Sequence, residues 1–204
     1  MSDYYDEKYQ SEGRFWGEQP TSLAHKVLEA LPPGGSPRLL EIGCGEGRDL
    51  VFFARNGYQV TGFDLSSKGV RKTKDYAAEL NLSVDVFQAN LNEFRLQDQY
   101  DVVFSSGTLQ YIPSGLREGI IANYKKFTNP GGIHAFTIPV YKPFIPREPD
   151  ADDKEQDWIS GEIMTHYHDW MIEFFIEQIL DNMSGGEFGV NRLIARNPSA
   201  QPLP

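Results

Sequence analysis

Two hydrophobic patterns alternate along the middle of the chain, one typical of strands and the other of helices. Short apolar or alternating runs predict strands at 39–42, 58–63, 82–87, 100–106 and 133–138. Apolar residues three and four positions apart predict helices at 21–31, 46–56, 67–80 and 114–128. Strands that alternate with helices of these lengths indicate an α/β fold with a parallel sheet built by right-handed crossovers.

The two ends of the chain are less regular. Residues 1–20 contain dense aromatic side chains without a helical or strand period, and we interpret them as a strap packed on the domain or as a lid over a pocket. Residues 139–160 form a long, proline-rich and acidic segment, which we interpret as an active-site loop. Residues 171–180 fit a helix by length and a strand by their aromatic and branched side chains. A flexible tail is expected over 198–204.

Composition limits the classes of protein and partner. A chain of 204 residues, 40% of them hydrophobic, predicts one globular domain over 1–204. A net charge of −10 disfavours nucleic acid, and no apolar run reaches the length of a membrane span. Cys44 is the single cysteine and the first residues do not resemble a signal peptide, so we expect a cytoplasmic location. The expected oligomeric state is a monomer or a homodimer. The acidic run 148–157 is interpreted as a solvated loop.

A glycine-rich turn joins the strand at 39–42 to the helix that follows it. Glycines occupy positions 43, 45 and 47, so a ligand could approach the backbone closely and face the N–H groups at the helix start. Dinucleotide-binding turns usually read G-x-G-x-x-G, whereas Arg48 and Asp49 stand here where the third glycine could be. Glu41 precedes the turn, and its carboxylate suits a cationic ligand better than a pyrophosphate.

Asp64 ends the second predicted strand, 21 residues after Gly43. A carboxylate at this place can accept hydrogen bonds from both hydroxyls of a ribose. The alternative is that Asp64 caps the next helix, although Ser66 and Ser67 could do the same. We favour the ribose.

These motifs carry a family resemblance. The run 41–47 resembles the first motif of class I S-adenosylmethionine (SAM) dependent methyltransferases, and the Asn-Pro-Gly-Gly at 129–132 is similar to a signature of the same family. The resemblance covers 20–138 best. It implies a Rossmann-like fold: a mostly parallel seven-stranded sheet with an antiparallel last strand and helices on both faces, in which 171–180 is a strand paired with 190–195. The implied cofactor is SAM, which becomes S-adenosylhomocysteine (SAH).

The resemblance also implies a set of site residues. Glu41 and the backbone near Gly43 and Ser105 would hold the methionyl ammonium, Asp64 the ribose, and Asn90 with Leu91 the adenine. The full set expected at the cofactor is Glu41, Gly43, Cys44, Gly45, Arg48, Asp64, Leu65, Asn90, Leu91, Ser105 and Ser106. The residues expected at the acceptor or in a lid are Tyr9, Trp16, Gln110, Tyr111, Tyr141 and Arg147.

No general base is assigned, because a base is needed only if the acceptor arrives protonated. Tyr9, Tyr111 and His166 are the candidates in that case. No metal is expected, because the histidines at 166 and 168 lack a complete ligand set. His134 lies within a predicted strand and is interpreted as a core residue.

The turn and the Asn-Gly-Tyr-x-Val segment at 56–60 look most like the tellurite-resistance type of methyltransferase, and they are similar to thiopurine S-methyltransferases. This branch implies a small-molecule acceptor such as tellurite, selenite or a thiol. Transfer to an oxygen or nitrogen of a small metabolite is the alternative. An NAD(P)-dependent oxidoreductase would share the glycine turn and Asp64 but leaves Glu41 unexplained. A non-catalytic SAM-binding module would carry the same cofactor residues.

Overall fold

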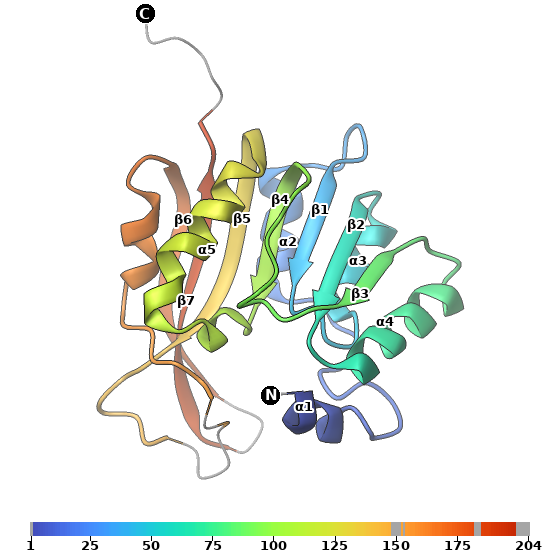
Figure 1. Cartoon of the computed structure of the whole chain (residues 1–204), viewed down its shortest axis with the longest axis horizontal. Helices are drawn as coiled ribbons and strands as arrows, with labels where there is room; N and C mark the ends of the chain where they lie inside the picture. Colours follow the sequence, from blue (N-terminus) through green and yellow to red (C-terminus); the bar gives the residue numbers. More distant parts are fainter. Residues whose placement is uncertain (1, 148–151, 153, 182–184, 199–204) are drawn as a thin grey trace, which may run out of the picture.

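A seven-stranded sheet carries the fold in the computed structural model, which describes residues 2–147, 152, 154–181 and 185–198 (Figure 1). The strand order is β3-β2-β1-β4-β5-β7-β6. The strands are β1 (Arg38–Ile42), β2 (Gln59–Asp64), β3 (Asp85–Gln88), β4 (Tyr100–Ser106), β5 (Thr128–Val140), β6 (Met171–Asp181) and β7 (Glu187–Arg196).

Strands β1 to β5 pair in parallel, and β7 pairs antiparallel with both β5 and β6. The expected α/β fold, with a mostly parallel sheet and an antiparallel last strand, is confirmed. Residues 171–180 belong to β6, so the strand alternative was correct there. Its ambiguity has a physical cause: β6 is an edge strand whose exposed and half-buried side chains do not alternate cleanly.

Helices flank the sheet on both faces (Figure 1). They are α1 (Ser2–Lys8), α2 (Ser22–Ala30), α3 (Arg48–Arg55), α4 (Ser67–Glu79) and α5 (Ser114–Lys126), with 3-10 turns η1 (Leu109–Tyr111) and η2 (Glu162–Tyr167). The four helices predicted from periodicity are confirmed to within two residues at each end. Two of them begin at good N-caps, since the hydroxyls of Thr21 and Ser66 accept from the amides of Ala24 and Gly69 at 3.3 and 3.0 Å.

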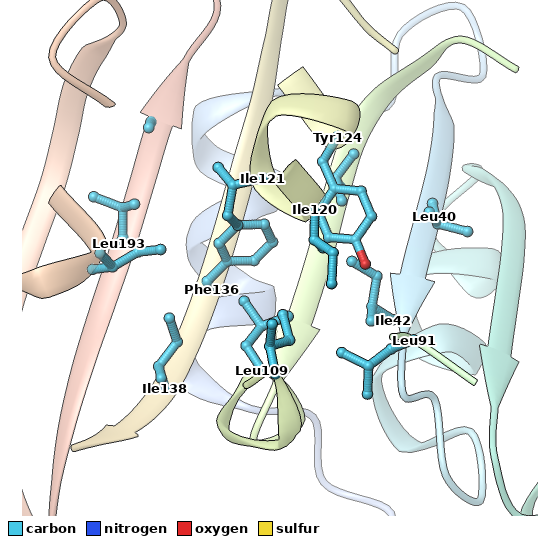
Figure 2. Packing of buried hydrophobic residues seen from close by; sticks show 14 of the residues in the cluster. Leu40, Ile42, Leu91, Leu109, Ile120, Ile121, Tyr124, Phe136, Ile138 and Leu193 are labelled. Atoms are coloured by element: carbon cyan, nitrogen blue, oxygen red, sulfur yellow. The ribbon is translucent and has the colours of Figure 1, made fainter. Parts of the chain in front are cut away.

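Two hydrophobic clusters lie on opposite faces of the sheet. On one face, Ile120, Ile121 and Tyr124 of α5 pack against apolar side chains of β1, β5 and β7 (Figure 2). On the other, α2 and α3 cover the alternate residues of β1, β4 and β5. The central strands therefore bury both of their faces, and this burial explains their nearly continuous apolar sequences.

His134 is a core residue, as the sequence predicts. Its ring is fully buried in β5, with Nδ1 2.6 Å from the Tyr167 hydroxyl and Nε2 2.8 Å from the Thr128 hydroxyl. Both ring nitrogens thus have partners, which joins η2 to the sheet. Burial lowers the pKa of His134 to about 3.

The N-terminal region differs from expectation, because residues Ser2–Lys8 form α1 although no period predicts a helix there. Tyr5 lies on α1 and Tyr9 one turn later, and their rings contact each other with centroids 5.8 Å apart. This helix is too short to be stable alone, so its contacts with the domain hold it. Among the described helices none is both long and apolar enough to cross a bilayer.

We predict that His134 makes the fold sensitive to acid. The folded protein keeps the imidazole neutral down to about pH 3, whereas the unfolded chain protonates it near pH 6.5. Stability from this residue is complete above pH 6.5 and is lost as the pH falls toward 3, by about 2 kcal/mol between pH 7 and pH 5. Urea denaturation of the unmodified protein and of His134→Gln, which does not titrate, measures this difference. Equal pH dependence in the two proteins would contradict it.

Candidate functional site

The glycine turn at 43–47 sits at the carboxyl end of β1 and is tied to the neighbouring strand. The amides of Gly43 and Cys44 both donate to the Phe63 carbonyl of β2, at 2.8 and 3.0 Å. Gly43 has φ +72°, and a Cβ there would lie 2.1 Å from Oγ1 of Thr108. Gly45 has φ +53°, and a Cβ there would lie 2.8 Å from the Tyr9 hydroxyl. Both positions therefore require glycine for backbone conformation and for space.

Asp64 holds the same turn from the end of β2. Its Oδ2 accepts from the Gly45 amide and its Oδ1 from the Ser66 amide, each at 2.8 Å. Because Ser66 caps α4, the alternative that Asp64 is the helix cap is wrong. Each carboxylate oxygen keeps a lone pair for a further donor. Burial raises the pKa of Asp64 and the two amides oppose the shift.

Glu41 is a buried carboxyl group with a free oxygen. Its side chain is 3% exposed, and Oε2 has no hydrogen-bond partner among the described residues. Burial, with Asp49 nearby, raises its pKa well above the ordinary value. A cation or a hydrogen-bond donor in the adjoining cavity would satisfy this oxygen.

A cavity of about 740 Å³ extends from the turn along the carboxyl edge of the sheet. It contains most of the residues that the sequence assigns to a cofactor, namely Glu41, Gly43, Cys44, Gly45, Arg48, Asp64, Leu65, Leu91 and Ser106. It also contains all the residues assigned to the acceptor or a lid, namely Tyr9, Trp16, Gln110, Tyr111, Tyr141 and Arg147. The structure thus brings residues from both ends of the chain to one space.

Three of the candidates are not among the residues that line this cavity. Ser105 turns its hydroxyl to the Ile42 carbonyl at 3.0 Å. Asn90 donates to Glu93 at 2.9 Å. His166 lies in η2, beside Trp158 at 6.2 Å between ring centroids. Their proposed roles remain predictions.

Hydrogen bonds hold the segment after α1 over the glycine turn. Glu46, 2% exposed, accepts from the Phe15 amide at 2.7 Å and from Nζ of Lys72 at 2.6 Å. The same Lys72 donates to the carbonyls of Ser11 and Gly13 at 3.0 and 2.7 Å. One ion pair therefore connects α4, the turn and the N-terminal segment.

At the other end of the cavity a carboxylate and two tyrosines form a hydrogen-bonded chain. The Tyr111 hydroxyl donates to Oε1 of Glu155 at 3.4 Å and lies 3.0 Å from the Tyr5 hydroxyl. Burial raises the pKa of both tyrosines and of Glu155.

Sequence reasoning missed Tyr5, Glu46 and Glu155. Tyr5 belongs to the aromatic N-terminal segment, but nothing in its spacing distinguishes it from Tyr4. Glu155 belongs to the acidic run interpreted as a solvated loop, and only the fold shows that it faces a tyrosine. Residues 148–151 and 153 of that run, and the tail from 199 onward, lie outside the described residues.

The residues present fit SAM, which carries an ammonium, a carboxylate, a sulfonium and a ribose. The unpartnered Glu41 oxygen suits the ammonium, and Asp64 keeps acceptor capacity for the ribose hydroxyls. The half-buried Ala89 and the buried Leu91 supply an apolar wall at the ends of the strands, as an adenine ring requires.

Comparison with known proteins shows which family shares this glycine turn and its neighbouring strands. A family model described as a methyltransferase domain matches residues 39–132, the region of the turn, Asp64 and β4. The chain contains a class I methyltransferase domain. The Haemophilus influenzae protein "Probable S-adenosyl-L-methionine-dependent methyltransferase TehB" is 23% identical over 82% of this chain and 54% of its own length. The chain thus spans about half the length of that curated relative. "Aklanonic acid methyltransferase DauC" of Streptomyces sp. (strain C5) is 26% identical over 84% of each protein.

Solved structures agree in fold. The crystal structure of Haemophilus influenzae TehB matches with a TM-score of 0.77 at 20% identity, over 96% of this chain and 66% of TehB. NodS of Bradyrhizobium japonicum, an N-methyltransferase in complex with SAH, matches at 0.73 and 14% identity, over 97% and 98% of the two chains. The resemblance to SAM-dependent methyltransferases of the TehB-like branch and the choice of SAM as cofactor are confirmed.

Within the described part of the methyltransferase domain and its flanks, no group of three or more histidine, cysteine, aspartate or glutamate side chains is placed to hold a metal ion. Cys44 is 5% exposed, and burial raises the pKa of its thiol well above the ordinary value. A buried thiol of this kind packs as a small apolar side chain, not as a nucleophile.

We predict that Gly43→Ala destabilises the protein by more than Gly107→Ala. Both glycines have φ near +73°, so each alanine costs about 1 kcal/mol in backbone strain. Only the Gly43 site also places the new Cβ against Thr108, whereas nothing lies within 4 Å at Gly107. Overpacking should add about 1–3 kcal/mol. Urea unfolding of the two variants separates the effects, and equal losses would contradict the proposed packing of the turn.

Proposed function

We propose that this protein binds SAM along the carboxyl edge of β1, β2 and β4 and transfers its methyl group to a small molecule. The observation that carries the proposal is the buried, unpartnered Glu41 oxygen beside a turn that Asp64 anchors. A positively charged amino acid moiety and a ribose are the two groups that these carboxylates would accept.

Bound SAM supplies a methyl group activated by a positively charged sulfur. The task of the protein is then alignment and exclusion of water. Glu41 binds the ammonium, Asp64 binds the ribose, and Leu91 packs on the adenine. The N-terminal segment covers the cavity through Tyr9, which is 5% exposed and accepts from the Trp16 indole at 3.1 Å.

Two classes of methyl acceptor are consistent with this cavity. The resemblance of the turn and of residues 56–60 to tellurite-resistance methyltransferases favours a chalcogen oxyanion such as tellurite or selenite, or a thiol, none of which requires a general base once ionised. The Glu155 carboxylate favours instead an acceptor that arrives with a proton on oxygen or nitrogen. A small-molecule acceptor is common to both, in a cavity of about 740 Å³.

We predict that Asp64→Asn weakens SAH binding by about 1.5–3 kcal/mol, which is about ten- to 150-fold in Kd. The amide keeps the shape of the side chain but loses the charge that strengthens the ribose hydrogen bonds. Its NH2 group also replaces one of the two oxygens that accept from Gly45 and Ser66. Isothermal titration of the purified protein with SAH measures the effect.

Asp85→Asn is the matched control, since it makes the same charge change at the exposed start of β3. Its Kd should equal that of the unmodified protein. NAD is titrated in parallel, and tight NAD binding in place of SAH would favour the oxidoreductase alternative. Unchanged SAH affinity in Asp64→Asn would refute the ribose assignment.

We also predict that Lys72→Met speeds SAH release. The substitution keeps the apolar stem but removes three contacts that hold residues 11–15 over the turn. A loss of about 1–2 kcal/mol in lid closure corresponds to about a five- to thirtyfold faster dissociation rate. Stopped-flow displacement measures it, with Lys74→Met, an exposed lysine on the same helix, as control. If release is unchanged, these residues form a strap with no role in retention.

A further inference from the structure

We propose that the methyl acceptor is a small amine that enters as an ammonium ion, and that Glu155 binds it and accepts its proton. This inference rests on the proposed function, because it assigns the free end of the same cavity. The accepting atom is nitrogen, and the carboxylate that binds it, Glu155, is not among the residues assigned from the sequence.

The acceptor end adjoins the cofactor turn directly. The Thr108 side chain packs against Gly43, and η1 begins at the next residue and brings Tyr111 into the cavity. From Tyr111 the hydrogen-bonded chain continues to Glu155 on one side and Tyr5 on the other. A group bound by Glu155 therefore lies in the same space as the cofactor and beside the turn that holds it.

An unsatisfied amide marks the same place. Gln110 is 5% exposed and lines the cavity, and its Oε1 has no hydrogen-bond partner among the described residues. Its Nε2 donates to the Gly107 carbonyl at 2.8 Å, and a hydrogen bond from the Gln110 side chain to Glu155 lowers the pKa of that carboxyl group. A buried acceptor without a donor is costly, and an N–H of a bound ligand would satisfy it. The side chains of Gln110 and Glu155 thus offer two hydrogen-bond acceptors, which a ligand that carries N–H donors would satisfy.

Two carboxyl groups, Asp152 and Glu155, lie at this end, and Arg147, a cation that acts on Glu155, is paired with Asp157. Asp152 is 7% exposed, has no partner for Oδ2 among the described residues, and raises the pKa of both Glu155 and Tyr111. The aromatic rings of Tyr5 and Tyr111, 6.1 Å apart between centroids, add faces that attract cations. An oxyanion would meet repulsion here, whereas an ammonium would be attracted.

The cationic side chains that line the cavity are already engaged. Arg147 pairs with Asp157 and Lys142 with Glu177. Arg192 donates to Gln178 at 2.9 Å, Arg48 contacts Asp49, and Lys8 lies over the Tyr4 ring. An oxyanion that bound to Arg147 or Lys142 in place of its carboxylate partner would have to break an existing ion pair.

The reaction balances with the groups present. The acceptor nitrogen gives one proton to the Glu155 carboxylate and forms a bond to the methyl carbon with its freed electron pair. The carbon–sulfur bond breaks, and its electrons stay on sulfur as the neutral thioether of SAH. Glu155 then returns the proton to water.

The test uses three probes of one length and different charge: butylammonium, butanol and butyrate, with selenite as the oxyanion. Each is titrated calorimetrically into protein saturated with SAH, which fills the cofactor end. We expect butylammonium to bind at least about tenfold more tightly than butyrate or selenite, a difference of about 1.4 kcal/mol. In Glu155→Gln this preference should disappear, while SAH affinity stays unchanged.

Glu118→Gln is the matched control, because it removes the same charge from an exposed position on α5. It should keep the preference for the cation. Tighter binding of butyrate or selenite in the unmodified protein, or an unchanged preference in Glu155→Gln, would overturn the proposal and leave the proposed function intact. Failure to bind SAH would overturn both. The ranking of the probes in the unmodified protein tests the proposal even if the variant does not fold.

Discussion

The site depends on one contact between neighbouring strands: the Asp64 carboxylate at the end of β2 accepts from the Gly45 amide in the turn after β1, at 2.8 Å. With the Phe63 carbonyl, which accepts from two further amides of the turn, it holds a glycine backbone at positive φ. The turn then leaves its outer side open to a ligand. Because the charged group that fixes the turn also lines the cavity, the geometry of the turn and the proposed binding of the ribose depend on the same side chain.

The cavity has buried carboxyl groups at both of its ends. Glu41 and Asp64 at one end and Glu155 at the other all have raised pKa values because they have left water. Such groups are retained where a ligand compensates them, and SAM carries positive charge on both its ammonium and its sulfur. Tyr5, Tyr9 and Trp16 of the N-terminal segment line the same cavity, so aromatic rings lie beside the buried carboxyl groups.

The fold could be predicted well from the sequence because the central strands bury both faces and their apolar runs are distinct from the helical periods between them. The turn and Asp64 could be predicted because they lie within 21 residues of each other. Tyr5 and Glu155 could not, since the first contacts a residue 106 positions away and the second lies in a run of charges that looks solvated. Asn90 and Ser105 were assigned by motif; their side chains hydrogen-bond to Glu93 and to the Ile42 carbonyl, and their roles at the cofactor remain predictions.

The most direct measurement is a crystal structure of the protein with SAH. The account predicts that the amino group of SAH lies within hydrogen-bond distance of Glu41 and that its ribose hydroxyls lie at Asp64, with the adenine against Leu91. Density for SAH elsewhere, or with its ribose away from Asp64, would contradict the assignment of the glycine turn as the cofactor site.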